Sequence, residues 1–187
     1  MYREYEFPKL HSKDDFYAAV YGDDLVALIK AIVEKEGPIH LHTLAQRVAA
    51  GYSMGRVGEK IEEIVRTAVK ECASKKAITL KHDFVWHGPY NPDGLVPRRP
   101  SANGTPRPVE FVAIEEMATA VVWILKRDRG VPRDSLVTSV ARIMGYDRTG
   151  HNVEEQINKA IDSLLSKNRI SQYEDQLILA SDKGTSR

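Results

Sequence analysis

An internal repeat constrains the fold of this chain more than any other feature of its sequence. The 187 residues match themselves without a gap at an offset of 92 residues, which is the separation of Arg56 from Arg148. The identical pairs include Ile32/Ile124, Leu44/Leu136, Arg56/Arg148, Gly58/Gly150 and Ile78/Ile170. A match of this length in one register implies one structural unit that was duplicated.

A proline-rich segment separates the two copies and holds six of the nine prolines. Because proline lacks a backbone N–H and blocks helix formation, this segment is expected to be an extended linker. The expected organisation is an N-terminal arm over 1–23, a first unit over 24–88, the linker over 89–110, a second unit over 111–182 and a disordered tail over 183–187.

Three helical stripes and one alternating stretch make up each copy. In the first copy the stripes run from Leu25 to Ile32, over 41–48 and over 61–72, with apolar residues at helical spacing. The stretches "ITLKHDFVW" and "ISQYEDQLIL" then alternate around short polar turns, as β-hairpins do. We therefore predict a mainly α fold with small β-hairpin wings (α+β), arranged as a tandem winged helix-turn-helix repeat.

The turn before the third helix carries an arginine and a glycine in both copies, in "GRVGEK" and "DRTGHN". Free N–H groups at a helix N-terminus attract anions, and an arginine beside them can bind a phosphate. Asn152 and Glu155 are expected to act as the N-cap and capping box of the second of these helices. The alternative is structural: the glycines permit the turn, and each arginine pairs with a local glutamate.

We infer candidate nucleic-acid contacts on the third helices, the first wing and the linker. They are Arg56, Gly58, Lys60, Arg66, Lys70, Lys81, Arg98, Arg99, Arg148, Gly150, His151 and Lys159. The same helix faces also carry carboxylates such as Glu59, Glu62 and Glu154, and the formal net charge of the chain is only +1. Because DNA readers depend on neutralising phosphates, docking to another protein stays open as an alternative.

Other classes of function lack support in the sequence. It contains no phosphate-binding loop, nucleophile elbow or dinucleotide turn, so we expect neither catalysis nor a cofactor. It contains no H-E-x-x-H or C-x-x-C, so we expect no metal site. The single cysteine, Cys72, is expected in the core and fits a reducing cytoplasm, and no apolar segment suggests a membrane span or a secretory signal.

The phrases "IVEKEGPIHLHTLAQRVA", "GRVGEKIEEIV" and "LVTSVARIMGYDRTGHNVEEQINKAIDSLLSKNRI" resemble the uncharacterised C-terminal domain of large bacterial superfamily 1 DNA helicases. Proteins of that family often carry an endonuclease-like domain just upstream. The resemblance implies a non-catalytic accessory module that helps a helicase engage DNA. Its expected partners are DNA and the motor or nuclease domains of the same protein. The family's ATPase and nuclease motifs lie outside the matching segment.

Two alternatives to this function remain open from the sequence. In the first, the module docks other proteins within a helicase or nuclease assembly. A free-standing transcription regulator is a further alternative, and it would require a dimer that reads a palindromic site.

Overall fold

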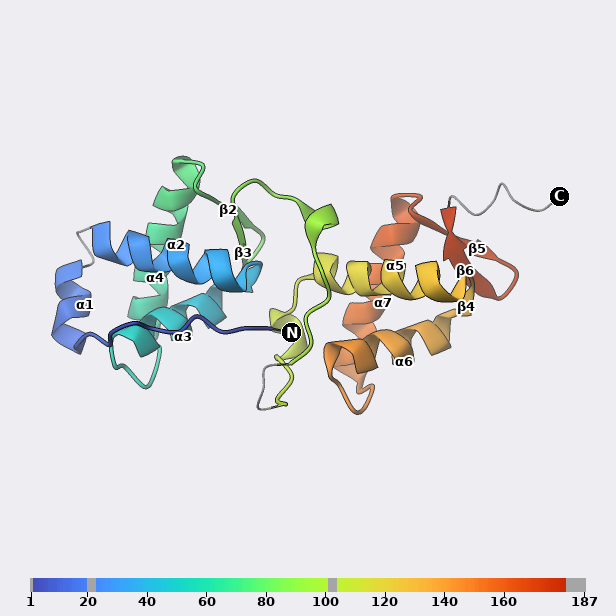
Figure 1. Cartoon of the computed structure of the whole chain (residues 1–187), viewed down its shortest axis with the longest axis horizontal. Coiled ribbons are helices and arrows are strands. Elements are labelled where there is room, and N and C mark those ends of the chain that lie inside the picture. Colours follow the sequence, from blue (N-terminus) through green and yellow to red (C-terminus); the bar gives the residue numbers. More distant parts are fainter. Residues whose placement is uncertain (1, 20–22, 101–103, 181–187) are drawn as a thin grey trace. The chain divides into compact units, whose positions relative to one another are not determined.

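The chain folds into two compact units, each combining helices with one small antiparallel sheet, so the fold is α+β (Figure 1). One unit is Arg3–Tyr90, and the other is Asn91–Arg187 together with Met1–Tyr2. The computed structural model describes residues 2–19, 23–100 and 104–180. The tail predicted to be disordered over 183–187 lies outside the described residues.

The described residues of the N-terminal unit form four helices and three strands. They are α1 (Lys13–Ala19), α2 (Asp23–Glu36), β1 (Ile39–His40), α3 (Leu41–Gly51), α4 (Glu59–Ser74), β2 (Ile78–Lys81) and β3 (Phe84–His87). Strand β3 lies between β1 and β2, and both pairings are antiparallel. The turn at His82 and Asp83 joins β2 to β3, as the alternating sequence pattern predicts.

The C-terminal unit begins with two short 3₁₀ helices and then repeats the same order of elements. They are η1 (Pro92–Gly94), η2 (Val109–Phe111), α5 (Ile114–Asp128), β4 (Val131–Pro132), α6 (Arg133–Met144), α7 (His151–Ser166), β5 (Ile170–Tyr173) and β6 (Gln176–Leu179). Each element from β4 to β6 begins 92 residues after its counterpart between β1 and β3. The duplication inferred from the sequence is therefore present in the secondary structure.

Each unit has its own hydrophobic core, formed where three helices pack on one another and on the sheet. In Figure 1, α4 crosses behind α2 and α3, and α7 crosses behind α5 and α6 in the same manner. The predicted inward stripes are buried, including Ile29, Ile32, Leu44, Val65 and Cys72 in one core and Val121, Ile124, Leu136, Ile157 and Leu164 in the other. Full burial of a large aliphatic side chain contributes about 1.5–3 kcal/mol, so these stripes determine how the helices pack.

Strands β1 and β4 and helix α1 are elements that the sequence patterns do not predict. Ile39 pairs with Val85, and Val131 pairs with Leu177, which makes each predicted hairpin a three-stranded sheet. A strand of two residues is too short to show an alternating pattern. Helix α1 buries Phe16 against the first core.

Candidate functional site

The segments 56–58 and 148–150, which we call the N-terminal and C-terminal corners, lead directly into α4 and α7. Gly58 and Gly150 are the N-cap residues of these helices, and both have extended backbones with φ of −96° and −71°. A Cβ added at either glycine would meet no atom within 4 Å. Neither backbone conformation nor internal packing requires glycine there, so the explanation that these glycines serve only to permit the turn is not supported.

The capping box predicted for the C-terminal corner is wrong. Helix α7 begins at His151 with Gly150 as its N-cap, and no side chain caps it. Asn152 therefore lies within the first turn, and Glu155 forms an ion pair with Lys159 at 2.8 Å. The first N–H groups of α4 and α7 consequently have no side-chain acceptor from the N-cap residue, which leaves them able to bind an anion.

Arg56 and Arg148 are exposed at the two corners. Among the described residues neither forms an ion pair, so the alternative in which each pairs with a local glutamate does not occur there. Each arginine lies two residues before the N-cap glycine of its helix. An exposed guanidinium this close in sequence to uncapped helix N–H groups can join them in binding a phosphate.

A polar network lies next to the N-terminal corner. Arg56 lines an open hollow of about 490 Å³, which is bounded on α3 by His42 and Gln46. The His42 ring bonds Glu62 at 3.0 Å through Nδ1 and Gln46 at 3.1 Å through Nε2. Burial lowers the pKa of the neighbouring His40, whose Nδ1 accepts the backbone N–H of His42. Both ring nitrogens of His42 are thus engaged within the chain, and Glu62 places a carboxylate close to the hollow.

The other candidate residues of the N-terminal unit are partly engaged within the chain. Arg66 pairs with Asp83 at 3.4 Å, and the Lys81 amino group lies 3.5 Å from the centre of the Tyr90 ring. The remaining two candidates on this face, Lys60 and Lys70, are exposed, and Lys60 lies 5.6 Å from the Tyr17 ring.

Helix α7 offers fewer available cations than α4. Its Lys159 is neutralised by Glu155, and His151 is exposed beside the exposed carboxylate of Glu154. The C-terminal corner therefore depends on Arg148 and on the helix N-terminus for any attraction of an anion.

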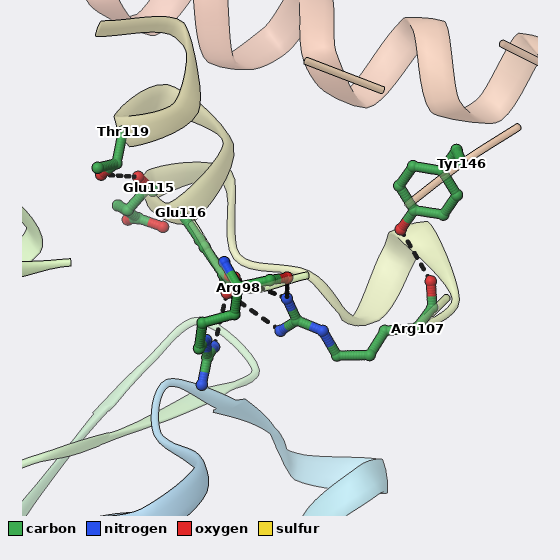
Figure 2. Close-up of polar contacts among 6 residues, drawn as sticks. All are labelled: Arg98, Arg107, Glu115, Glu116, Thr119 and Tyr146. Carbon is green, nitrogen blue, oxygen red and sulfur yellow. Dashed lines mark hydrogen bonds and ion pairs between the residues drawn. The ribbon is translucent and has the colours of Figure 1, made fainter. Parts of the chain in front are cut away.

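Arg98 is held by a buried carboxylate (Figure 2). Arg98 and Arg107 converge on Glu116, whose side chain is fully buried, with the closest N–O distances both 2.6 Å. The backbone N–H of Arg98 also donates to Glu116 at 3.0 Å, and the Tyr146 hydroxyl donates to the Arg107 carbonyl at 2.8 Å. This cluster fastens the linker to α5. Arg99 remains exposed.

The electrostatics of Glu116 follow from this cluster. Burial alone raises its pKa, but the Arg98 and Arg107 guanidiniums more than compensate, so the pKa of Glu116 lies below its usual range. Burial also raises the pKa of Tyr146, to about 12. Glu116 is therefore ionised and Tyr146 neutral at physiological pH.

A second buried carboxylate, Glu36, holds the N-terminal arm in a similar way. It accepts the backbone N–H of Tyr5 at 2.8 Å and the Arg47 Nε at 3.1 Å. The roles of Glu36 and Glu116 were not predicted from the sequence. A signal existed at Glu36, because it continues the inward stripe of Ile29, Ile32 and Val33 at helical spacing.

Within residues 2–19, 23–100 and 104–180, no cluster of three or more histidine, cysteine or acidic side chains is placed to hold a metal ion. In the same part of the chain, none of the helices combines the length and the apolar character needed to cross a membrane.

Comparison with known protein families finds a similarity in the N-terminal unit. A family described as "Protein of unknown function (DUF3320)" matches residues 14–63, which extend from α1 into the first turns of α4. No curated protein and no solved structure matches the chain. Over these residues the chain is thus similar to an uncharacterised domain, and the matched part includes the N-terminal corner.

Proposed function

We propose that each unit is a winged helix and that the tandem module binds DNA through its two corners, as a non-catalytic accessory part of a DNA helicase. Two observations support the winged-helix assignment. Each repeat has three helices followed by a hairpin, namely α2, α3, α4 and β2–β3 in the first and α5, α6, α7 and β5–β6 in the second. A short strand, β1 or β4, follows the first helix of each repeat and joins the sheet. In such a fold the turn before the third helix faces the nucleic acid.

One observation carries the proposal. The two corners, 92 residues apart, share two features. Each has an exposed arginine that forms no ion pair within the described residues, and each leads into a helix whose N-terminus lacks a side-chain cap. A hydrogen bond to a charged group contributes about 1.5–3 kcal/mol, and an anion at a helix N-terminus about 0.3–1 kcal/mol. Two corners that contact phosphates therefore give moderate affinity without reading bases.

The mixed charge of the helix faces supports this mode over sequence-specific recognition. Glu59 and Glu63 are exposed on α4 near the corner, and Glu154 and Glu155 are exposed on α7. Carboxylates so close to the duplex would repel phosphates along the whole helix face. The proposed contact is therefore confined to the corners and depends strongly on salt.

The helicase context is supported by the resemblance of the repeat motifs and is compatible with the match to an uncharacterised domain. In this context the module holds DNA while the motor and nuclease domains of the same protein act on it. A direct check is whether the motor domain, expressed separately, co-purifies with this chain and whether DNA strengthens that association.

Fluorescence anisotropy at low salt with duplex, forked and single-stranded DNA tests the corners. The double substitution Arg56→Glu and Arg148→Glu should abolish binding, because each change replaces an attraction by a repulsion. The matched control is Lys35→Glu with Arg127→Glu, which are exposed counterparts at the ends of α2 and α5. It produces the same change in net charge and should retain most of the affinity. Equal loss in both variants would refute a role of the corners.

Serine at the two N-caps separates binding from folding. Gly58→Ser and Gly150→Ser place a hydroxyl that accepts a helix N–H, so the free energy of unfolding should rise by a few tenths of a kcal/mol. The same hydroxyl occupies the N–H groups proposed for the phosphate, so DNA affinity should fall. Thermal unfolding and anisotropy on one preparation measure both effects. A more stable variant with unchanged affinity would contradict the proposed anion site.

A further inference from the structure

The C-terminal unit carries an apolar groove between the linker, α5 and the C-terminal end of α7. Leu95, Val96 and Pro97 of the linker line one part of it, and Ala118, Val122 and Trp123 of α5 line another. The hollow has a volume of about 470 Å³. Trp123 is 50% exposed and Val96 is 71% exposed, although both are large apolar residues. Exposed apolar surface gathered around a hollow is typical of a protein-binding site.

The charges that line the groove select the partner. Arg169 and Asp93 neutralise each other at 2.9 Å, and Glu115 adds one carboxylate to the lining. Lys126 and Lys167 form no ion pair within the described residues, so the lining keeps an excess of positive charge. Two amino groups without an ion pair in the described part of the chain therefore line the same hollow as Trp123. Complementary charge at the rim of an apolar site raises the association rate and selects partners of the opposite sign.

We propose that this groove docks an amphipathic acidic segment of a partner protein. A bulky apolar side chain of that segment fills the hollow beside Trp123, and flanking carboxylates pair with Lys126 and Lys167. Grooves that bind one face of a helix commonly use this combination of apolar anchor and charged rim.

The groove is separate from the corner proposed to bind DNA. Helix α7 begins at the C-terminal corner and ends beside Lys167, and its 16 residues span about 24 Å at 1.5 Å per residue. The proposal therefore does not rest on DNA binding, and one unit can hold DNA at one end of α7 and a protein segment at the other.

The probe is a fluorescein-labelled helical peptide with a leucine stripe flanked by glutamates, titrated with the full chain and followed by anisotropy. Two control peptides carry lysine in place of each glutamate or serine in place of each leucine. We expect the acidic, leucine-bearing peptide to bind and both controls to bind at least about tenfold more weakly. If the acidic peptide does not bind, or if the lysine peptide binds equally well, the proposal is refuted.

Two variants of the chain complete the test. Lys126→Glu with Lys167→Glu should lose the acidic peptide and gain the lysine peptide, which an unfolded or merely hydrophobic surface would not do. Trp123→Ala should weaken the acidic peptide at least about tenfold and leave DNA affinity unchanged. Joint loss of DNA and peptide binding in Trp123→Ala would overturn the separation of the two surfaces.

Sedimentation velocity distinguishes a second copy of the chain from a partner segment. If the wild-type chain dimerises and Trp123→Ala is a monomer, the groove is an interface between copies, and the proposed acidic partner is wrong. A monomeric wild-type chain that binds the acidic peptide supports the proposal.

Discussion

Replacing Glu116 by glutamine tests how the linker is fastened to the C-terminal unit. The glutamine is nearly isosteric, but it removes the charge that the Arg98 and Arg107 guanidiniums face. These side chains are only 15% and 14% exposed, so water cannot take over the lost contacts freely. The amide nitrogen also points a donor at one of the two guanidiniums, where the carboxylate offered an acceptor.

The magnitude follows from the burial of the cluster. Removing one partner of a buried ion pair costs about 3–5 kcal/mol, and the remaining exposure of the two arginines favours the lower end. A loss of about 3 kcal/mol in a unit of this size lowers its melting temperature by about 12–24 °C. Differential scanning calorimetry of the whole chain measures this shift. Glu155→Gln, which removes an exposed pair on α7, is the control and should cost at most about 0.5 kcal/mol.

The same variant has a defined pH dependence. Because the pKa of folded Glu116 lies below its unfolded value, its stabilisation is present at neutral pH and is lost as pH falls through the folded pKa. The stability difference between the wild-type chain and Glu116→Gln should therefore shrink in acid, beginning below about pH 4.5. A cost under about 1 kcal/mol at neutral pH, or a difference that does not change with pH, would refute this account of the cluster.

Two further predictions concern residues near that cluster. Gly145→Ala should lower the free energy of unfolding by more than about 1 kcal/mol, because Gly145 has a φ of +90° and an added Cβ would overlap the Pro100 ring. Urea unfolding measures the loss, and Gly55→Ala is the control, because a Cβ at Gly55 meets no atom within 4 Å. Because the pKa of folded Tyr146 is raised to about 12, its contribution to stability is lost as pH rises from about 10 toward that value. The melting temperature of Tyr146→Phe should therefore fall less steeply above about pH 10 than that of the wild-type chain. Equal dependence in both chains would contradict the burial of this hydroxyl.

Much of the fold could be predicted from periodicity alone. Apolar residues at helical spacing locate α2, α3 and α4, and the change to an alternating pattern at Ile78 locates the hairpin. The internal repeat shows the same patterns a second time in the C-terminal unit. The short strands β1 and β4 could not be predicted, because each has only two residues and depends on a partner strand distant in sequence. The helix start at His151 was misplaced because Asn152 and Glu155 satisfy a local capping pattern that the turn geometry does not use.

The candidate site could be predicted only in part. The corners stand out in the sequence because an arginine and a glycine recur at one offset. Arg98 was grouped with them as a cation, but its partner Glu116 follows the linker and is recognised only once α5 and the linker are folded together. The exposure of Trp123 was equally hidden, because a tryptophan on an amphipathic helix is more often in a core. Tertiary context, which no local pattern contains, decides both.

The salt dependence of DNA binding tests the central proposal most directly. For duplex DNA, the logarithm of the binding constant falls linearly with the logarithm of the salt concentration, with a slope of about −0.9 per neutralised phosphate. If both corners hold phosphates, Arg56→Gln with Arg148→Gln should reduce the magnitude of the slope by about 2. An unchanged slope, or no measurable binding by the wild-type chain at low salt, would contradict the account.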